Sequence, residues 1–131
     1  MGKVIAISGS GFRLKELAGP SGKGLITSWL SHYPGARAKF RVRVKNLRST
    51  PQTQWTKKQF RSLGNGLFEI KWKFSKKEFR SVGFYHGGFF VMLIGCTHKQ
   101  NVYDPPSWLE SAKYRKGEVE NGQWNTVDHE P

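Results

Sequence analysis

Residues 66–93 read GLFEIKWKFSKKEFRSVGFYHGGFFVML. In this stretch apolar and charged residues alternate, a turn sequence follows, and the alternation then resumes. From Phe68 to Phe74 every second side chain is apolar, and charged side chains lie between them. A period of two is typical of a half-buried antiparallel strand. The sequences SKK and HGG interrupt the pattern, and glycine supplies the positive φ that a tight turn needs. We therefore expect a three-stranded meander.

The third strand of this meander is expected to lie inside the sheet. The sequence FFVMLIGC over residues 89–96 has no polar alternation, which is typical of a strand covered on both faces. Cys96 ends this run and is the single cysteine, so no internal disulfide can form, which fits a reducing cytoplasm. We expect Cys96 to be a buried, unreactive thiol.

Two helices are expected before the meander. Apolar residues at helical spacing predict a helix over 25–33, ended by the sequence YPG. Apolar residues at intervals of four, four and three predict a second helix over 35–48, antiparallel to the first. Its other face carries six basic residues, including Arg37 and Arg41. Either an acidic partner relieves their mutual repulsion, or they form an ordinary solvated face.

A third helix is expected after the meander. The sequence DPPSWLESAKYRK begins with Asp104, a candidate cap, and places proline in the first turn. Beyond Gly117 we expect a frayed tail over 118–131. A chain of 131 residues with 37% hydrophobic content fits one folded domain spanning 1–131.

Charge is the strongest compositional signal. The formal net charge is +13, with 22 Lys and Arg against nine Asp and Glu. Most of the excess lies before residue 104, where only three residues are acidic. A basic body of this kind points to a polyanionic partner.

Several other classes of protein are excluded by missing patterns. No apolar run is long enough to span a membrane. The sequence GPSGKG lacks the first glycine and the final Ser or Thr of a phosphate-binding loop, and we read it as a loop. The four histidines are scattered, and no metal-ligand spacing is present, so we expect no metal and no cofactor.

The region from about residue 55 to residue 116 resembles the RelE/HigB-type toxins of bacterial type II toxin–antitoxin modules, in particular their phage-derived HigB-like branch in the RelE/ParE superfamily. The matching residues are Leu63, Gly66, Leu67, Phe68, Glu69, Ile70, Lys71, Phe79, Arg80, Val82, Phe84, Lys99, Pro105, Glu110 and Ala112. The family pattern has Arg at position 71, Tyr at 83, His at 95 and Lys at 100, where this chain has Lys71, Gly83, Gly95 and Gln100.

The resemblance implies an α+β fold, with an N-terminal helical hairpin packed on a small antiparallel sheet and a C-terminal helix. It also implies a toxin that cleaves mRNA on the ribosome, without metal, and so inhibits translation in the cytoplasm. The partners would be ribosome-bound mRNA and an antitoxin protein encoded nearby, with no role for a membrane.

In such an endoribonuclease the substrate 2′-OH attacks its own phosphate, and cations must stabilise the charge that develops. We expect Lys71, Lys73 and Arg80 to form a phosphate-facing cluster on the solvent side of the meander, with Lys71 and Arg80 catalytic. Lys99 is expected to complete the cluster. His98 is the candidate general acid or base, because histidine titrates near neutral pH.

Other residues are assigned to RNA binding or to the sheet. Tyr85 and Tyr103 are expected to stack on a base or donate a proton. Arg37 and Arg41 are expected to bind RNA. Glu69 is interpreted either as an ion-paired residue within the sheet or as a catalytic base.

Two alternatives to the ribonuclease stay open. The loss of Tyr and His at positions 83 and 95 favours a non-catalytic RNA- or ribosome-binding module on the same scaffold, whereas Arg80 and Lys71 fit either reading. A gyrase poison, as in the related ParE branch, is the other alternative.

Overall fold

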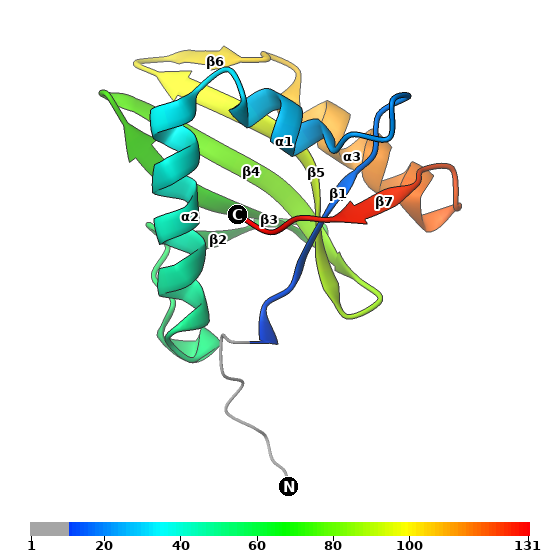
Figure 1. Ribbon diagram of the computed structural model, residues 1–131, viewed down its shortest axis with the longest axis horizontal. Coiled ribbons are helices and arrows are strands. Elements are labelled where there is room, and N and C mark those ends of the chain that lie inside the picture. Colours follow the sequence, from blue (N-terminus) through cyan, green and yellow to red (C-terminus); the bar gives the residue numbers. More distant parts are fainter. Residues whose placement is uncertain (1–10) are drawn as a thin grey trace, which may run out of the picture.

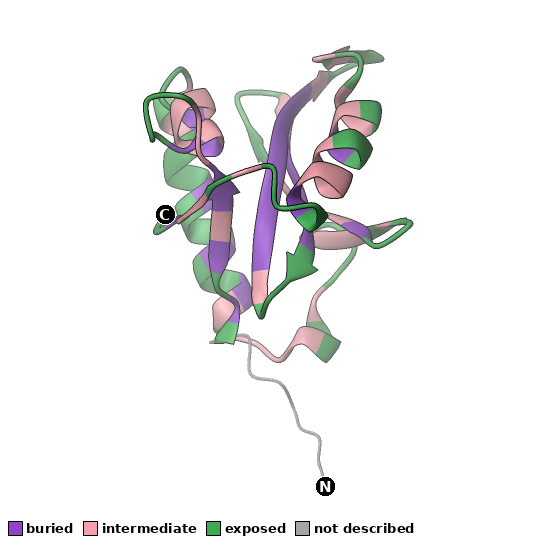
Figure 2. Ribbon diagram, turned by 90° about the vertical axis from the view of Figure 1, so that its right-hand side faces the viewer, coloured by how far each residue is buried: buried purple, intermediate pink, exposed green. Residues whose placement is uncertain are grey.

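The computed structural model describes residues 11–131, which form three layers. A seven-stranded sheet lies between helices α1 and α2 on one face and helix α3 on the other (Figures 1 and 2). In chain order the elements are β1 (Leu14–Leu17), α1 (Leu25–Leu30), α2 (Pro34–Arg48), the short 3-10 helix η2 (Gln52–Gln54), β2 (Phe60–Gly64), β3 (Leu67–Phe74), β4 (Lys77–His86), β5 (Phe89–Lys99), β6 (Val102–Asp104), α3 (Trp108–Glu120) and β7 (Thr126–Asp128).

The sheet is mixed rather than antiparallel. Its strand order is β2-β3-β4-β5-β1-β7, with β6 paired to the end of β5. β1 runs parallel to β5. The expected fold, a helical hairpin on a small antiparallel sheet, is therefore wrong. The sheet is larger because Leu14 and Leu17 bury their side chains beside β5, which makes β1 a strand that the alternation did not predict.

The predicted meander is confirmed as β3, β4 and β5, at the centre of the larger sheet. Two-residue turns, Ser75–Lys76 and Gly87–Gly88, connect the strands, and all four residues have φ between 54° and 82°. Glycine adopts this conformation freely, whereas closure of the hairpin must hold Ser75 and Lys76 in it. β5 is buried from Phe90 to Thr97, as its unbroken apolar sequence predicted.

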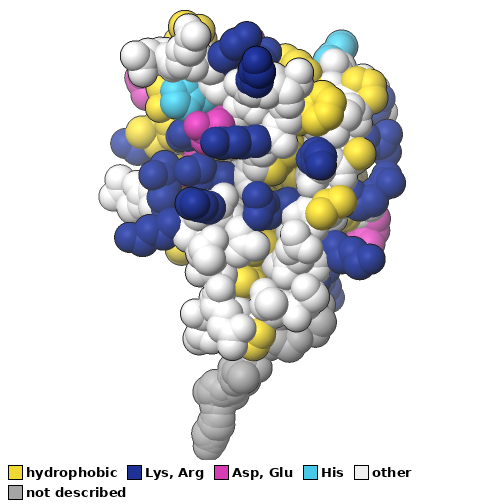
Figure 3. Space-filling view, turned by 90° about the vertical axis from the view of Figure 1, so that its left-hand side faces the viewer, with side chains coloured by type: hydrophobic (Ala, Val, Ile, Leu, Met, Phe, Trp, Pro, Cys, Tyr) yellow, Lys and Arg dark blue, Asp and Glu magenta, His cyan; other side chains and the backbone are white. Residues whose placement is uncertain are grey.

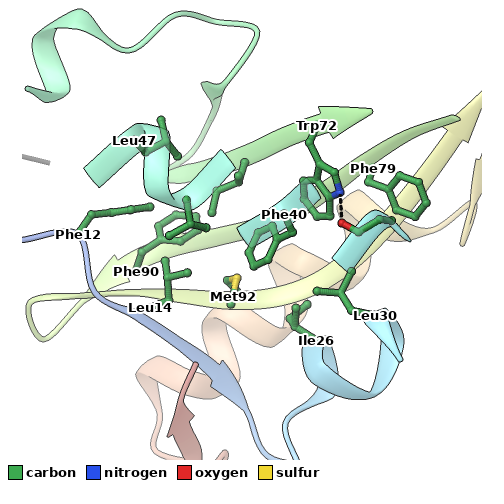
Figure 4. Close-up of a cluster of buried hydrophobic side chains, with 13 residues drawn as sticks. Phe12, Leu14, Ile26, Leu30, Phe40, Leu47, Trp72, Phe79, Phe90 and Met92 are labelled. Carbon is green, nitrogen blue, oxygen red and sulfur yellow. Dashed lines mark hydrogen bonds between the residues drawn. The ribbon is translucent and has the colours of Figure 1, made fainter. Parts of the chain in front are cut away.

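Helix α2 is amphipathic, as predicted, and covers one face of the sheet. Its buried residues include Ala36 and Phe40, and Phe40 packs on Trp72 of β3 with ring centroids 4.6 Å apart. The Trp72 Nε1–H donates a 3.0 Å hydrogen bond to the carbonyl oxygen of Ala36 (Figure 4). This bond satisfies a buried donor and fixes the start of α2 over β3.

The antiparallel helical hairpin is not formed. Helix α1 ends at Leu30, earlier than expected, and crosses the start of α2 instead of lying along it (Figure 1). A six-residue helix is too short to pair along α2, and Pro34 starts the new helix at its first turn.

The C-terminal segment also differs from expectation. Asp104 does not cap α3, because it pairs with Thr97 in the sheet, and Ser107 occupies the cap position. Helix α3 continues past Gly117 to Glu120. No helix within residues 11–131 has the length and apolarity needed to cross a bilayer.

The tail expected to fray over 118–131 is ordered into β7, which pairs with β1. A buried contact after β7 holds the tail in place. His129 is buried, and its Nδ1 contacts the buried carboxylate of Glu16, which also accepts hydrogen bonds from the backbone N–H and the hydroxyl of Thr27. This cluster joins β1, α1 and the C-terminal end of the chain.

Candidate nucleic-acid interface

The strand register gathers charged side chains on the sheet face that α3 covers only in part. Lys71 lies opposite Arg80, and Lys73 opposite Glu78. Glu78 in turn lies opposite His98. Residues directly opposite on antiparallel strands project from the same face, so these five side chains share one surface. The sequence predicted four of them, Lys71, Lys73, Arg80 and His98.

Arg80 is the exception to the expected solvent-facing cluster. It is only 6% exposed, and its Nη1 lies 3.4 Å from Glu69 Oε1. Its guanidinium also lies over the ring of Tyr103, 5.3 Å from the centroid. The expectation that Arg80 grips a phosphate from the solvent side is therefore wrong, because an internal ion pair holds it. Its place in the sheet suits a residue that positions its neighbours.

Glu69 holds this part of the sheet together. It is fully buried, and its Oε2 accepts a 2.8 Å hydrogen bond from Arg61 Nε–H and lies 2.6 Å from Arg61 Nη2. Its Oε1 faces Arg80 but lacks an aligned hydrogen bond. Of the two interpretations of Glu69, the ion-paired residue is confirmed.

His98 lies on β5, at the side of this surface next to Glu78 and Arg80. Its Nδ1 lies 3.4 Å from Arg80 Nη2 and 4.0 Å from Glu78 Oε2. Its ring stacks on Tyr103, with centroids 4.1 Å apart and planes 2° from parallel. Tyr103 stacks in turn on Trp108 at the start of α3. The imidazole therefore has a fixed orientation.

The two neighbours of Nδ1 select different tautomers of His98. Arg80 can only donate, so its contact requires a lone pair on Nδ1 and a proton on Nε2. Glu78 can only accept while it is ionised, so a shift toward Glu78 places the proton on Nδ1 and leaves Nε2 as a base. This arrangement allows proton transfer at Nε2.

Lys71 and Lys73 line an open hollow of about 520 Å³ at the edge of β3. Its lining residues are Arg43, Lys58, Lys71, Trp72, Lys73 and Glu78. β2 pairs with β3 as far as Phe60 opposite Ile70, and the Lys71 N–H donates a 2.9 Å hydrogen bond to the carbonyl oxygen of Gln59. Beyond Lys71, no described strand pairs with this edge of β3. We call this space the cationic hollow. Figure 3 shows Lys and Arg side chains crowding this side of the molecule.

The cations of the hollow are not neutralised by the protein. Within residues 11–131, none of its four Lys and Arg side chains takes part in a salt bridge. Only one acidic residue, Glu78, lines the space. A concave surface with unpaired cations favours an anionic ligand such as a phosphate backbone.

Four of the predicted RNA-binding residues lie elsewhere. Lys99 follows His98 on β5 and so projects from the opposite face, where it lines a separate hollow with Lys77. Arg37 and Arg41 are exposed on the far flank of α2, beside a third hollow.

Tyr85 is the fourth predicted RNA-binding residue that lies away from His98. It packs against Phe60, Phe68 and Phe90 on the face that carries α1 and α2. Its hydroxyl accepts a 2.7 Å hydrogen bond from Gln52 Nε2, and burial raises its pKa. Tyr103, by contrast, lies at His98.

Two of the departures from the toxin pattern have a packing explanation. A side chain at Gly83 would overlap the backbone of Val91, and one at Gly95 would overlap the ring of Trp29 on α1. Both positions lie on the face that carries α1 and α2, away from His98. The absence of Tyr and His at these positions therefore removes nothing from the surface around His98.

Sequence reasoning missed several residues of this surface. Glu78 lies two positions before Arg80 and so follows the same alternation, from which it could have been found. Arg43 and Lys58 had no distinguishing signal among so many cations. Trp108 reaches the site only because β6 returns the chain beside β5.

Two further expectations concern chemistry. Cys96 is buried, and burial raises its pKa to about 11, so the thiol is protonated and unreactive, as predicted. Within residues 11–131 no three His, Cys, Asp or Glu residues group as metal ligands would.

In comparisons of the sequence with known protein families and with curated proteins, and of the fold with solved structures, nothing matches this chain.

Proposed function

We propose that the protein is a metal-independent endoribonuclease. The observation that carries this proposal is the position of His98 opposite Glu78, which lines the cationic hollow together with Lys71 and Lys73 of the same sheet face. A fixed imidazole can move protons, and neighbouring cations can hold a phosphate, which together suit cleavage of an RNA backbone.

In the proposed reaction the 2′-oxygen of the substrate attacks the adjacent phosphorus, and the bond from phosphorus to the 5′-oxygen breaks. The products are a 2′,3′-cyclic phosphate and a 5′-hydroxyl. The leaving 5′-oxygen takes its proton from water, and His98 then returns its proton to solvent. His98 Nε2 accepts the 2′-hydroxyl proton, and Glu78 stabilises the imidazolium through Nδ1. Lys71 and Lys73 stabilise the charge on the phosphorane. Tyr103 positions His98 by stacking on its ring. Arg80 contacts Nδ1 only in the tautomer that has its proton on Nε2, so this contact is lost when Nε2 acts as the base.

The biological setting is a proposal from the resemblance over about residues 55–116. The protein is then the toxin of a type II toxin–antitoxin pair, which cuts mRNA on the ribosome and arrests translation in the cytoplasm. The antitoxin would cover the cationic hollow, whose charge favours an acidic segment.

A second candidate is a non-catalytic RNA- or ribosome-binding module. Burial of Arg80 against Glu69 favours it, since this cation is already paired and is withdrawn from a phosphate. Cleavage and binding must therefore be measured separately.

The test uses labelled mRNA with translating ribosomes. We expect wild-type protein to cut the RNA, and His98→Gln to reduce the cleavage rate by at least 100-fold. Lys99→Ala is the matched control, because it alters the next residue on the opposite face, and it should cleave at the wild-type rate.

Translation arrest with intact mRNA would refute the nuclease and support the binding module. When the protein is expressed in cells, a DNA damage response without translation arrest would point to the gyrase poison. Equal activity of wild type and His98→Gln would place the catalytic group elsewhere.

A further inference from the structure

A second, shallower hollow continues the cationic hollow along α2. It is lined by Lys39, Val42, Arg43, Asn46, Trp72 and Lys73. Arg43, Trp72 and Lys73 line both spaces, so the two form one groove. We call it the α2 groove. It runs from Glu78, beside His98, to Lys39 and Asn46.

The new part of the groove has cations and no acids. Lys39 is exposed, and neither Lys39 nor Arg43 takes part in a salt bridge within residues 11–131. The Nε–H of Arg43 is buried and has no hydrogen-bond partner. Helix α2 contains no acidic residue at all. A buried, unsatisfied donor of a charged group is costly, and an anion beside the Arg43 guanidinium would offset part of that cost.

We propose that the α2 groove binds the sugar–phosphate backbone of single-stranded RNA next to the nucleotide held at His98. This inference rests on the proposed function, since it extends the path of the same substrate. Lys39 and Arg43 are one helical turn apart, a rise of about 6 Å, so they can contact neighbouring phosphates. A single strand is favoured over a duplex because the groove is continuous with the site that must hold the cleaved strand.

The same helix supplies a matched control. Arg37 and Arg41 have the same spacing and are exposed, but they line a different hollow with Leu30 and Pro34. Replacing either pair removes two positive charges from α2. A difference between the two variants therefore reports position rather than net charge.

The experiment measures the affinity for fluorescein-labelled oligouridylates of four and 12 nucleotides, over a range of salt concentrations with a chelator. All proteins carry His98→Gln so that the RNA stays intact. We expect Lys39→Gln/Arg43→Gln to weaken binding of the 12-mer by roughly tenfold. The log–log salt slope should become shallower by about 1.4, for two lost phosphate contacts. Binding of the 4-mer should change less than twofold.

The control Arg37→Gln/Arg41→Gln should leave binding of the 12-mer within threefold. Equal losses in the two variants would overturn the proposal. The proposal would also be overturned if Lys39→Gln/Arg43→Gln lost more affinity for an RNA duplex or an acidic peptide than for the 12-mer. Thermal melting of each variant excludes unfolding as the cause.

The two proposals fail in different ways. The groove proposal fails if the 12-mer and the 4-mer lose affinity alike. The proposed phosphate site fails if Lys71→Gln/Lys73→Gln leaves binding of the 4-mer unchanged.

Discussion

Neutralising Glu69 should destabilise the protein strongly, because it leaves Arg80 as a buried charge without a counter-charge. Glu69 is fully buried and Arg80 is only 6% exposed. Arg61, the other partner, has a side chain that is 39% exposed and can recover hydration. The two arginines therefore contribute unequally to the expected loss.

The magnitude follows from these exposures. Removing one partner of a buried pair costs about 3–5 kcal/mol, whereas a half-exposed pair contributes about 0–1 kcal/mol. Glu69→Gln keeps an acceptor for Arg61, so we expect a loss of about 3 kcal/mol. The free energy of unfolding of such a domain is about 5–15 kcal/mol, so the variant should fold but melt earlier.

The assay is urea unfolding of Glu69→Gln, Arg80→Met and the variant that carries both changes. The double variant leaves no unpaired buried charge, so it should lose less stability than the sum of the two single variants, by at least 1 kcal/mol. A loss below about 1 kcal/mol in Glu69→Gln, or strict additivity, would refute the buried ion pair.

Three further predictions concern other buried groups. Burial alone would raise the pKa of Glu16, but the hydrogen bonds from His129 and Thr27 outweigh it and lower the pKa below 4.5. Glu16 therefore contributes stability that is complete above pH 4.5 and is lost as pH falls through its pKa in the folded protein. The urea midpoint of the wild type should fall as the pH is lowered through this range, and that of Glu16→Gln should fall less. Cys96, with a pKa of about 11 because of burial, should resist iodoacetamide at pH 8 when folded and react when unfolded in urea, and fast reaction of the native protein would contradict its burial. Gly95→Ala should lower the free energy of unfolding by about 1–3 kcal/mol, because the new methyl group overlaps the Trp29 ring. Gly117→Ala, which has open space around it, should raise this free energy by up to about 1 kcal/mol. Equal effects of the two substitutions in thermal melting would contradict the packing.

The parts of the fold that could be predicted are those with a strong local period. The alternation from Phe68 to Phe74 and the unbroken apolar run of β5 determined the meander, and helical spacing identified α2. β1 and β7 could not be predicted in this way. Each is three or four residues long, and its strand state depends on pairing with a distant segment and on the contact between Glu16 and His129.

The candidate site was predicted only in part. Alternation placed Lys71, Lys73 and Arg80 on one face, and the register brought His98 to them. The alternation could not show that Arg80 is buried. Its burial depends on tertiary contacts with the buried Glu69 and with the ring of Tyr103.

The chemistry of the cut RNA ends tests the central claim most directly. Wild-type protein is incubated with ribosome-bound mRNA, and the new 3′ ends are analysed by mass spectrometry. Attack by the substrate 2′-oxygen, with His98 as the proton acceptor, predicts 2′,3′-cyclic phosphate ends, and no cut at a 2′-deoxy position. Ends with a 3′-hydroxyl, or the absence of any cut, would contradict the proposal.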